Sequence, residues 1–435
     1  MTDFKGSGHR GSQVSRRAFL RGALRAGGTV GAALAVPWLP GCAGDDGPLP
    51  ALDWAVEKAE LVTITDTMAA FTWVTAEQRP TAIHIGDTAG PNRYVEATTP
   101  PTRYHYLEVD GLVPGRTYQY RLSTSMSSVW VDHSPGEVTT LVPPPGEPRL
   151  TFATMNDVHI GCDEVGLIEG GGEAFTWPDP ANPHYTFALE SAVSEINALN
   201  VDLVLVKGDL TCGYTEAEFI AAREILDGLT CPYYPLRGNH DRVGDNPDDY
   251  YLRVFGDLLP GGRSHFGLER QGLRFLCLDS SNLETGEPSL STDQVDWLAD
   301  EMQQSAGSPV MIFLHHAVIG APFGLYSEDR NAFLDATAGH DNLVGVFCGH
   351  SHRDSITTMA QLGDTPLVET AATLHYPSGF NVCRVYDGGY MQVAHRLHGP
   401  SCLEWNEMTR GLYAGLAEDV LWLAASERNF VYHYG

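Results

Sequence analysis

Five nearly continuous apolar runs after residue 149 end in the same kinds of residue: aspartate, asparagine and histidine. Runs that are apolar on both faces are typical of buried strands in α/β domains. In open α/β sheets, ligands bind beyond the carboxyl ends of the strands, so we expect these polar residues to meet at one edge. They are Asp157 and His159; Asp209; Asn239, His240 and Asp241; His315 and His316; His350 and His352.

The segment 150–398 is predicted to be one α/β domain. Strands are expected over 150–155, 201–206, 273–279, 310–314 and 343–347, and amphipathic helices over 185–199, 216–229 and 291–305. A loop at 166–184, rich in Gly and Pro, either lines a site or is a surface insertion. The C-terminal extension, 399–435, has a helical apolar pattern and is expected to dock on a folded domain.

The residues before this domain have a different sequence pattern. Short alternating segments over 51–142, separated by Gly, Pro and Asp, predict a small all-β sandwich. The stretch GLVPGRTYQYRL at 111–122 resembles a fibronectin type III turn and strand, which implies a corner role for Tyr118 and a core role for Trp73. The proline-rich stretch 143–149 is predicted to be a linker, because clustered prolines disfavour helix.

The first 42 residues resemble an export signal. SRRAFLR at 15–21 is followed by a mild apolar run at 26–39, an arrangement similar to twin-arginine signals. LPGC, ending at Cys42, is similar to a lipoprotein processing site, so a lipid at Cys42 is the expected membrane link. The alternative is a basic tail without an export role. We therefore expect an exported, periplasmic or extracytoplasmic protein.

The net charge and the cysteine spacing exclude one class of partner and one class of fold. The formal net charge is −28, which repels nucleic-acid backbones and excludes DNA or RNA as an expected partner. No CxxC spacing occurs, so a disulfide scaffold is not expected. Cys162 and Cys212 either approach each other or remain loop or core thiols, and the sequence favours the second alternative.

The polar residues, taken in chain order, form the series D-x-H, G-D, G-N-H-D, H and G-H-x-H. This series resembles the calcineurin-like metallophosphoesterase superfamily. The resemblance implies two packed β-sheets flanked by helices around a dinuclear metal centre, with Asp209 bridging. The implied ligands of the first metal are Asp157, His159, Asp209 and His352, and those of the second are Asp209, Asn239, His315 and His350.

Mixed Asp, Asn and His ligands suit Zn, Mn or Fe better than Mg or Ca, so two transition-metal ions are the expected cofactors. Two divalent ions lower the pKa of bound water toward ~7, which supplies a bridging hydroxide at neutral pH. His240 is predicted to protonate the leaving oxygen, and Asp241 is predicted to orient His240. The expected reaction is hydrolysis of a small phosphomonoester or phosphodiester.

Several positions leave alternatives open. Members of the resembled family usually have the sequence H-x-P at this position. The matching residues here are HHA, so His315 is favoured over His316 as the ligand, although the proline is absent. His316, His375 and Tyr376 are predicted substrate contacts. A fibronectin-like domain before such a centre is similar to purple acid phosphatases, but His159 and Cys212 replace their glycine and tyrosine. A rival function is a cell-surface binding protein with an inactive metal domain.

Overall fold

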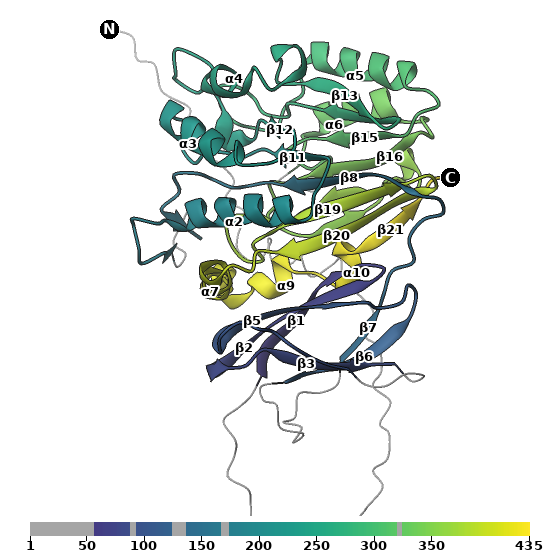
Figure 1. Cartoon of the computed structure of the whole chain (residues 1–435). Coiled ribbons are helices and arrows are strands. Elements are labelled where there is room, and N and C mark those ends of the chain that lie inside the picture. The colour runs from purple at the N-terminus through teal and green to yellow at the C-terminus, as the bar shows by residue number, and fades with distance from the viewer. Residues whose placement is uncertain (1–55, 88–92, 124–135, 167–173, 320–323) are drawn as a thin grey trace, which may run out of the picture. The chain divides into compact units, whose positions relative to one another are not determined.

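The computed structural model describes residues 56–87, 93–123, 136–166, 174–319 and 324–435 (Figure 1). The expected export segment 1–42, with Cys42, lies outside the described residues. Within the described ranges, no helix combines the length and the apolar character needed to cross a bilayer. The predicted fold class is confirmed, because an α/β unit with two six-stranded sheets follows a small all-β sandwich.

The sandwich has one three-stranded and one four-stranded antiparallel sheet. Trp73 and Phe71 are buried in its core, and the Tyr118 hydroxyl accepts the N–H of Val113 at 2.9 Å, which is the expected corner contact. The strands of the first sheet are β1 (Val56–Ile64), β2 (Met68–Arg79) and β5 (Thr102–Asp110), and those of the second are β3 (Ala82–Gly86), β4 (Arg93–Glu96), β6 (Thr117–Ser123) and β7 (Gly136–Thr139).

Two six-stranded sheets build the α/β unit. In the first, the order is β12-β11-β8-β19-β20-β21, and in the second it is β13-β14-β15-β16-β18-β17. The first sheet contains β8 (Pro148–Met155), β11 (Leu203–Lys207), β12 (Tyr233–Leu236), β19 (Gly379–Tyr386), β20 (Gly389–Arg396) and β21 (Phe430–His433). The second contains β13 (Phe266–Arg270), β14 (Leu273–Cys277), β15 (Val310–Phe313), β16 (Leu343–Cys348), β17 (Ser355–Thr357) and β18 (Leu367–Glu369).

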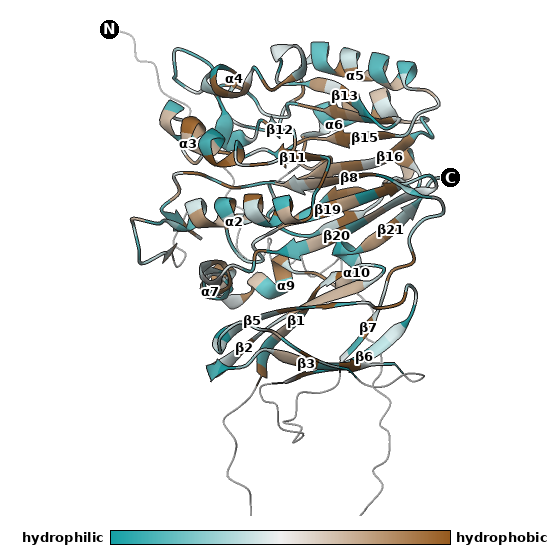
Figure 2. Ribbon diagram, viewed as in Figure 1, coloured by the Kyte–Doolittle hydropathy of each residue, from teal (hydrophilic) through white to brown (hydrophobic). Residues whose placement is uncertain are grey.

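The two sheets pack face to face through aromatic residues. Phe152 of β8 lies edge-on to Phe275 of β14 and Phe313 of β15, with ring centroids 5.2 Å and 6.0 Å apart. The next residues along these strands point the other way, where a second apolar core forms under the helices. Figure 2 shows the resulting apolar strands between partly polar helices. This explains why the strand sequences are apolar on both faces.

Helices cover the outer faces. The helix α3 begins with a capping box between Thr215 and Glu218, and α5 is capped by the Ser291 side chain. The C-terminal extension also joins the unit, because β21 pairs with β20. The helices are α2 (His184–Ala198), α3 (Glu216–Leu226), α4 (Tyr250–Phe255), α5 (Thr292–Gln304), α6 (Ser327–Thr337), α7 (Pro400–Thr409), α8 (Leu412–Gly415), α9 (Ala417–Leu421) and α10 (Ala425–Arg428).

Part of the 166–184 loop lies outside the described residues, at 167–173. Its described part includes β10 (Phe175–Thr176), which pairs with β9 (Glu164–Val165). Trp177 packs its ring against Trp405 of α7. This portion of the loop is therefore attached to the C-terminal extension.

Candidate metal centre

The predicted ligands all follow strands at the carboxyl ends of the two sheets. Asp157 and His159 come after β8, Asp209 after β11 and Asn239 after β12. His315 follows β15 in the second sheet, and His350 and His352 follow β16. The structure brings these seven residues together from five loops, because parallel strands in each sheet end on the same side.

Five of the seven predicted ligands have left-handed backbone conformations. Such a conformation costs about 1–3 kcal/mol for a residue other than glycine, and outliers of this kind cluster at functional sites. The loops thus hold these residues against their intrinsic preference. The φ angles are 54° at Asp157, 46° at His159, 53° at Asp209, 64° at His350 and 56° at His352.

Asp157 is the centre of one group. Its Oδ1 atom lies 3.2 Å from His352 Nε2 and 3.9 Å from His159 Nε2. The other oxygen, Oδ2, accepts hydrogen bonds from the His350 backbone and the Asn156 amide. One carboxylate oxygen is therefore fixed by the protein, and the other faces the two imidazoles.

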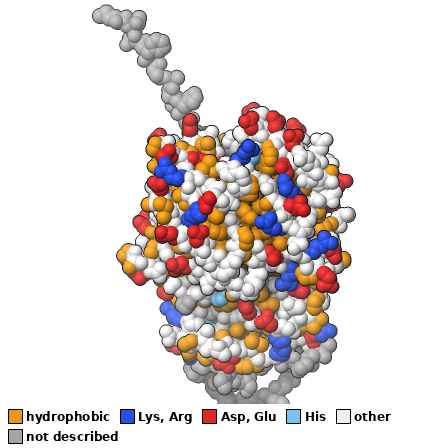
Figure 3. Space-filling model, turned by 45° about the horizontal axis from the view of Figure 1, so that its top comes forward, with side chains coloured by type: hydrophobic (Ala, Val, Ile, Leu, Met, Phe, Trp, Pro, Cys, Tyr) orange, Lys and Arg blue, Asp and Glu red, His pale blue; other side chains and the backbone are white. Residues whose placement is uncertain are grey.

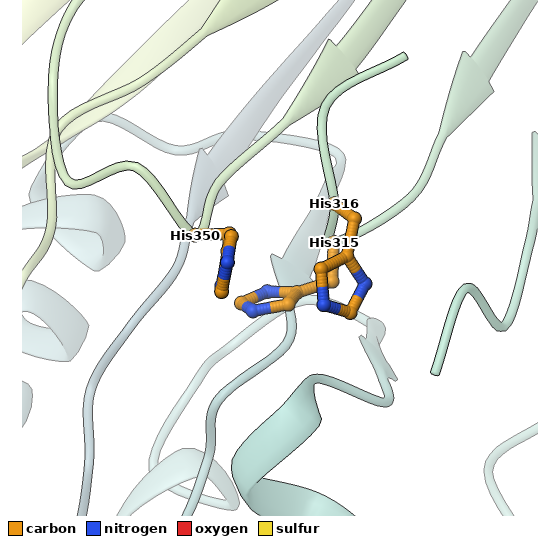
Figure 4. A group of neighbouring side chains, drawn as sticks. All are labelled: His315, His316 and His350. Carbon is orange, nitrogen blue, oxygen red and sulfur yellow. The ribbon is translucent and has the colours of Figure 1, made fainter. Parts of the chain in front are cut away.

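His315 belongs to a second group. Its Nε2 atom lies 3.3 Å from Asp209 Oδ2 and 2.9 Å from Asn239 Oδ1. Its Nδ1 donates to the Lys207 carbonyl at 2.8 Å, so the ring is oriented with Nε2 toward the other two side chains. The His350 ring lies beside it, with centroids 5.0 Å apart (Figure 4).

Asp209 connects the two groups. Its Oδ2 atom lies 3.3 Å from His315 Nε2 and 3.5 Å from His159 Nε2. Close packing fixes the loop, because a Cβ at Gly238 would lie only 2.2 Å from Asp209 Oδ1. Asp209 thus lies between the two groups, as its predicted bridging role would require.

These side chains fit a pair of metal ions. Metal–ligand bonds of 2.0–2.2 Å at octahedral or tetrahedral angles place neighbouring ligand atoms about 2.8–3.6 Å apart, and all the ligand-atom separations given above except that between Asp157 Oδ1 and His159 Nε2 lie in this range. Among the described residues, Asp157 Oδ1 and both ring nitrogens of His159 are buried without a hydrogen-bond partner. Buried polar atoms normally have partners, so these atoms indicate a missing ligand. The mixed N and O set suits Zn, Mn or Fe.

The electrostatics keep the carboxylates ionised. Burial alone would raise the pKa of Asp209, but the neighbouring imidazoles, with His315 first among them, together hold that pKa well below its usual value. His352 and His315 together lower the pKa of Asp157 in the same way. Burial lowers the pKa of His159 to about 3 and that of His350 to about 4, so both are neutral and able to bind metal at neutral pH.

The predicted partnership of His240 and Asp241 is wrong. The Asp241 carboxylate accepts backbone N–H groups of Leu210, Thr211 and Gly238, so it shapes the loops. His240 Nδ1 instead lies 2.8 Å from the Cys212 carbonyl. A carbonyl only accepts, so Nδ1 carries the proton and Nε2 is left for the cluster. His240 also lies close enough to His159 and Asp209 to be a third member of a metal-binding group.

The preference for free thiols at Cys162 and Cys212 is also wrong, because these residues form a disulfide. It joins the loop after His159 to the loop after Asp209. The two loops are already adjacent, since Ile160 and Thr211 form a β-bridge. The disulfide therefore ties together two loops that carry predicted ligands.

Tyr376 was predicted to contact the substrate, and this prediction is wrong. Its side chain is fully buried, and its hydroxyl donates to Glu60 of the sandwich at 2.6 Å, which excludes contact with a substrate. His375 is also buried and lies 2.8 Å from the His352 ring. His316 is buried beside His315 and His350 (Figure 4). Its Nδ1 lies 3.0 Å from Ser280 Oγ. His316 lies close enough to His315 and His350 to form a metal-binding group with them.

Lys207 is a residue of the site that sequence reasoning missed. Fully buried, it donates from Nζ to the Cys348 carbonyl in the second sheet, at 2.7 Å, and to Thr370 Oγ1. It therefore holds the ends of β11 and β16 together beneath the centre. A signal was present, since a lysine in an apolar strand directly before Gly208 is unusual.

Residues 150–354 match the family model described as calcineurin-like phosphoesterase. The chain carries a calcineurin-like phosphoesterase domain. The match covers every predicted ligand and ends two residues after His352. The protein is therefore a phosphoric ester hydrolase, which its curated relatives also indicate.

Two curated relatives match this phosphoesterase domain. The glycerophosphodiester phosphodiesterase GpdQ of Enterobacter lignolyticus is 29% identical over 194 residues, which cover 42% of this chain and 67% of the relative. A probable cyclic nucleotide phosphodiesterase of Synechococcus sp. is 27% identical over 210 residues, which cover 47% of this chain and 74% of the relative. Among solved structures, a dimetal phosphatase from Danio rerio covers 58% of this chain and 98% of its own, with 15% identity and a TM-score of 0.48.

Proposed function

We propose that this protein is an exported metallophosphoesterase that hydrolyses a small phosphodiester. The observation that carries the proposal is the position of Asp209 between two groups of imidazoles and carboxylate or amide oxygens. The first group is Asp157, His159 and His352, and the second is Asn239, His315 and His350. The rival function, a binding protein with an inactive metal domain, is disfavoured because no predicted ligand is missing or misplaced.

Two divalent ions bound in this centre would supply hydroxide at neutral pH and offset the charge of a phosphate. The protein provides only two carboxylates among the seven ligands, Asp157 and Asp209. The centre therefore keeps a positive charge that attracts an anionic substrate in spite of the acidic exterior. Nucleic acid is not an expected substrate, given the net charge of −28. Figure 3 shows acidic and basic side chains interspersed over one face, without a continuous basic area.

His240 is the proposed proton donor to the leaving oxygen. Its Nδ1–H is fixed by the Cys212 carbonyl, which leaves Nε2 for the centre, and its side chain lies near His159 and Asp209. A protonated Nε2 in that position can donate to an oxygen that leaves a phosphate held at the centre. The Cys212 carbonyl, rather than Asp241, sets the orientation of the ring.

The diester preference rests on the relatives, whose names describe glycerophosphodiester and cyclic nucleotide phosphodiesterases. Purified protein loaded with Mn²⁺ or Zn²⁺ should hydrolyse bis(p-nitrophenyl) phosphate faster than p-nitrophenyl phosphate. Asp209→Asn should abolish this activity. Asp202→Asn, at the opposite end of β11, is the matched control and should keep it. A monoester preference would overturn the diester proposal, and unchanged turnover in Asp209→Asn would overturn the proposed centre.

Export is proposed on two grounds. The first is the twin-arginine pattern at 15–21, and the second is the Cys162–Cys212 disulfide, a bond that persists in oxidising compartments. In cell fractions, the wild-type protein is expected outside the cytoplasm, and a variant with Arg16→Lys and Arg17→Lys is expected to stay inside. If Cys42 is lipidated, Cys42→Ala should move the exported protein from the membrane to the soluble fraction. Equal distribution of the wild type and the double arginine variant would contradict the export route.

A further inference from the structure

His375 contacts the predicted metal ligand His352 directly. The distance from His375 Nε2 to His352 Nδ1 is 2.8 Å, and His375 Nδ1 lies 2.8 Å from the Tyr376 carbonyl. The carbonyl only accepts, so Nδ1 of His375 carries the proton and Nε2 is its acceptor atom. His352 must then donate from its own Nδ1. Its Nε2 is left with a free lone pair, 3.2 Å from Asp157 Oδ1.

The backbone around His375 is held from two sides. Leu374 donates its N–H to the Asp157 carbonyl at 3.2 Å, on the side of the metal centre. On the other side, Trp405 Nε1 of α7 donates to the Leu374 carbonyl at 2.8 Å, and Tyr376 N–H donates to Thr409 Oγ1 at 2.9 Å. The His375 ring therefore has little freedom to turn away from His352.

The sandwich contributes the next contact. Glu60 of β1 is buried, and its Oε1 accepts from the Tyr376 hydroxyl at 2.6 Å and from Arg410 at 2.8 Å. Its Oε2 forms an ion pair with Arg396 of β20. Glu60 is thus the acceptor for a tyrosine that directly follows His375 in the chain.

We propose that His375 is a positioning residue that selects the metal-binding tautomer of His352, and that the sandwich holds His375 in place through Glu60 and Tyr376. The inference rests on the proposed metal centre. If the inference holds, the sandwich contributes to metal binding, although it is distant in sequence from every predicted ligand. Outer partners of metal-bound histidines act in this way by fixing the ring and its tautomer.

The test is calorimetric titration of metal-free protein with Mn²⁺, followed by a steady-state assay. His375→Leu should weaken one of two binding events by roughly 10–100-fold, the usual effect of losing such a partner. His375→Gln should restore affinity to within a few-fold, because the amide oxygen can accept from His352 Nδ1. His395→Gln changes a buried histidine of β20 that stacks on Phe380, and it should leave affinity unchanged.

The part played by the sandwich is tested with Tyr376→Phe, which removes only the hydroxyl that donates to Glu60. The control is Tyr390→Phe, because the Tyr390 hydroxyl donates to the Val344 carbonyl instead. Tyr376→Phe should weaken the same binding event, by less than His375→Leu does, and the control should not. Wild-type affinity in His375→Leu would overturn the inference while leaving the proposed function intact. Wild-type affinity in Tyr376→Phe alone would overturn the part played by the sandwich. Failure of the wild-type protein to bind Mn²⁺ would overturn both proposals.

Discussion

The two ring nitrogens of His240 have different surroundings, and this difference assigns its role. Nδ1 is committed to the Cys212 carbonyl, which leaves Nε2 for the centre, where the His240 side chain lies near His159 and Asp209. At the residue scale, most predicted ligands could be found from the sequence, because each follows an apolar run. The partners of Asp241, His375 and Tyr376 could not be found, because they depend on the direction of a side chain, which a sequence pattern does not specify.

His240→Asn is expected to lower kcat about 10²–10⁴-fold for a diester with an alkyl leaving group, because such an oxygen needs a proton. The loss should be smaller for bis(p-nitrophenyl) phosphate, whose leaving group is stable as an anion. Metal stoichiometry, measured by elemental analysis, should not change. His433→Asn, on the exposed side of β21, is the control. Equal losses on both substrates together with a lost metal would instead make His240 a ligand.

At the scale of elements, the strands that are apolar on both faces and the three amphipathic helices were predicted closely. The hairpin of β19 and β20 was not predicted, because buried polar residues such as Asn381, Gln392 and His395 interrupt its apolar pattern. Their burial follows from pairing with distant strands. The Cys162–Cys212 bond was missed for a similar reason, since its two loops are 50 residues apart in sequence and meet only at the strand ends.

Removing this disulfide should reduce both stability and turnover. A variant with Cys162→Ser and Cys212→Ser is expected to lose about 2–4 kcal/mol of unfolding free energy, because the unfolded chain is no longer cross-linked. Its kcat should fall more than its KM rises, because the Cys212 carbonyl orients His240. Thermal unfolding and steady-state kinetics measure the two effects. Cys231→Ser, at a free cysteine, should show neither, and a double variant that behaves like it would contradict the assigned role.

At the scale of the whole molecule, the sandwich and the phosphoesterase domain share a buried ionic contact. Glu60 of β1 meets Arg396 and Arg410, which come from β20 and from the residue after α7. The sequence predicted two folded parts and a linker, but it gave no sign of this contact. A glutamate in an alternating strand is ordinarily exposed, and its burial depends on the surface that the strand meets.

Glu60 should make stability depend on pH. Burial would raise the pKa of Glu60, but Arg396 and Arg410 outweigh burial and lower it from 4.5 to about 2. The folded state is therefore stabilised above pH 4.5, by roughly 3 kcal/mol, and this stabilisation is lost as the pH falls toward 2. Urea unfolding of the wild type and of Glu60→Gln should show a gap that narrows between pH 7 and pH 3. Glu57→Gln, exposed on the same strand, should show no gap, and a constant gap for Glu60→Gln would contradict the prediction.

The central claim is that two metal ions share Asp209. Anomalous diffraction from crystals grown with Mn²⁺ tests it most directly, because each ion appears as a separate peak. We predict two peaks on either side of the Asp209 carboxylate, one beside Asp157, His159 and His352 and the other beside Asn239, His315 and His350. A single peak, or two peaks of which only one contacts Asp209, would contradict the account.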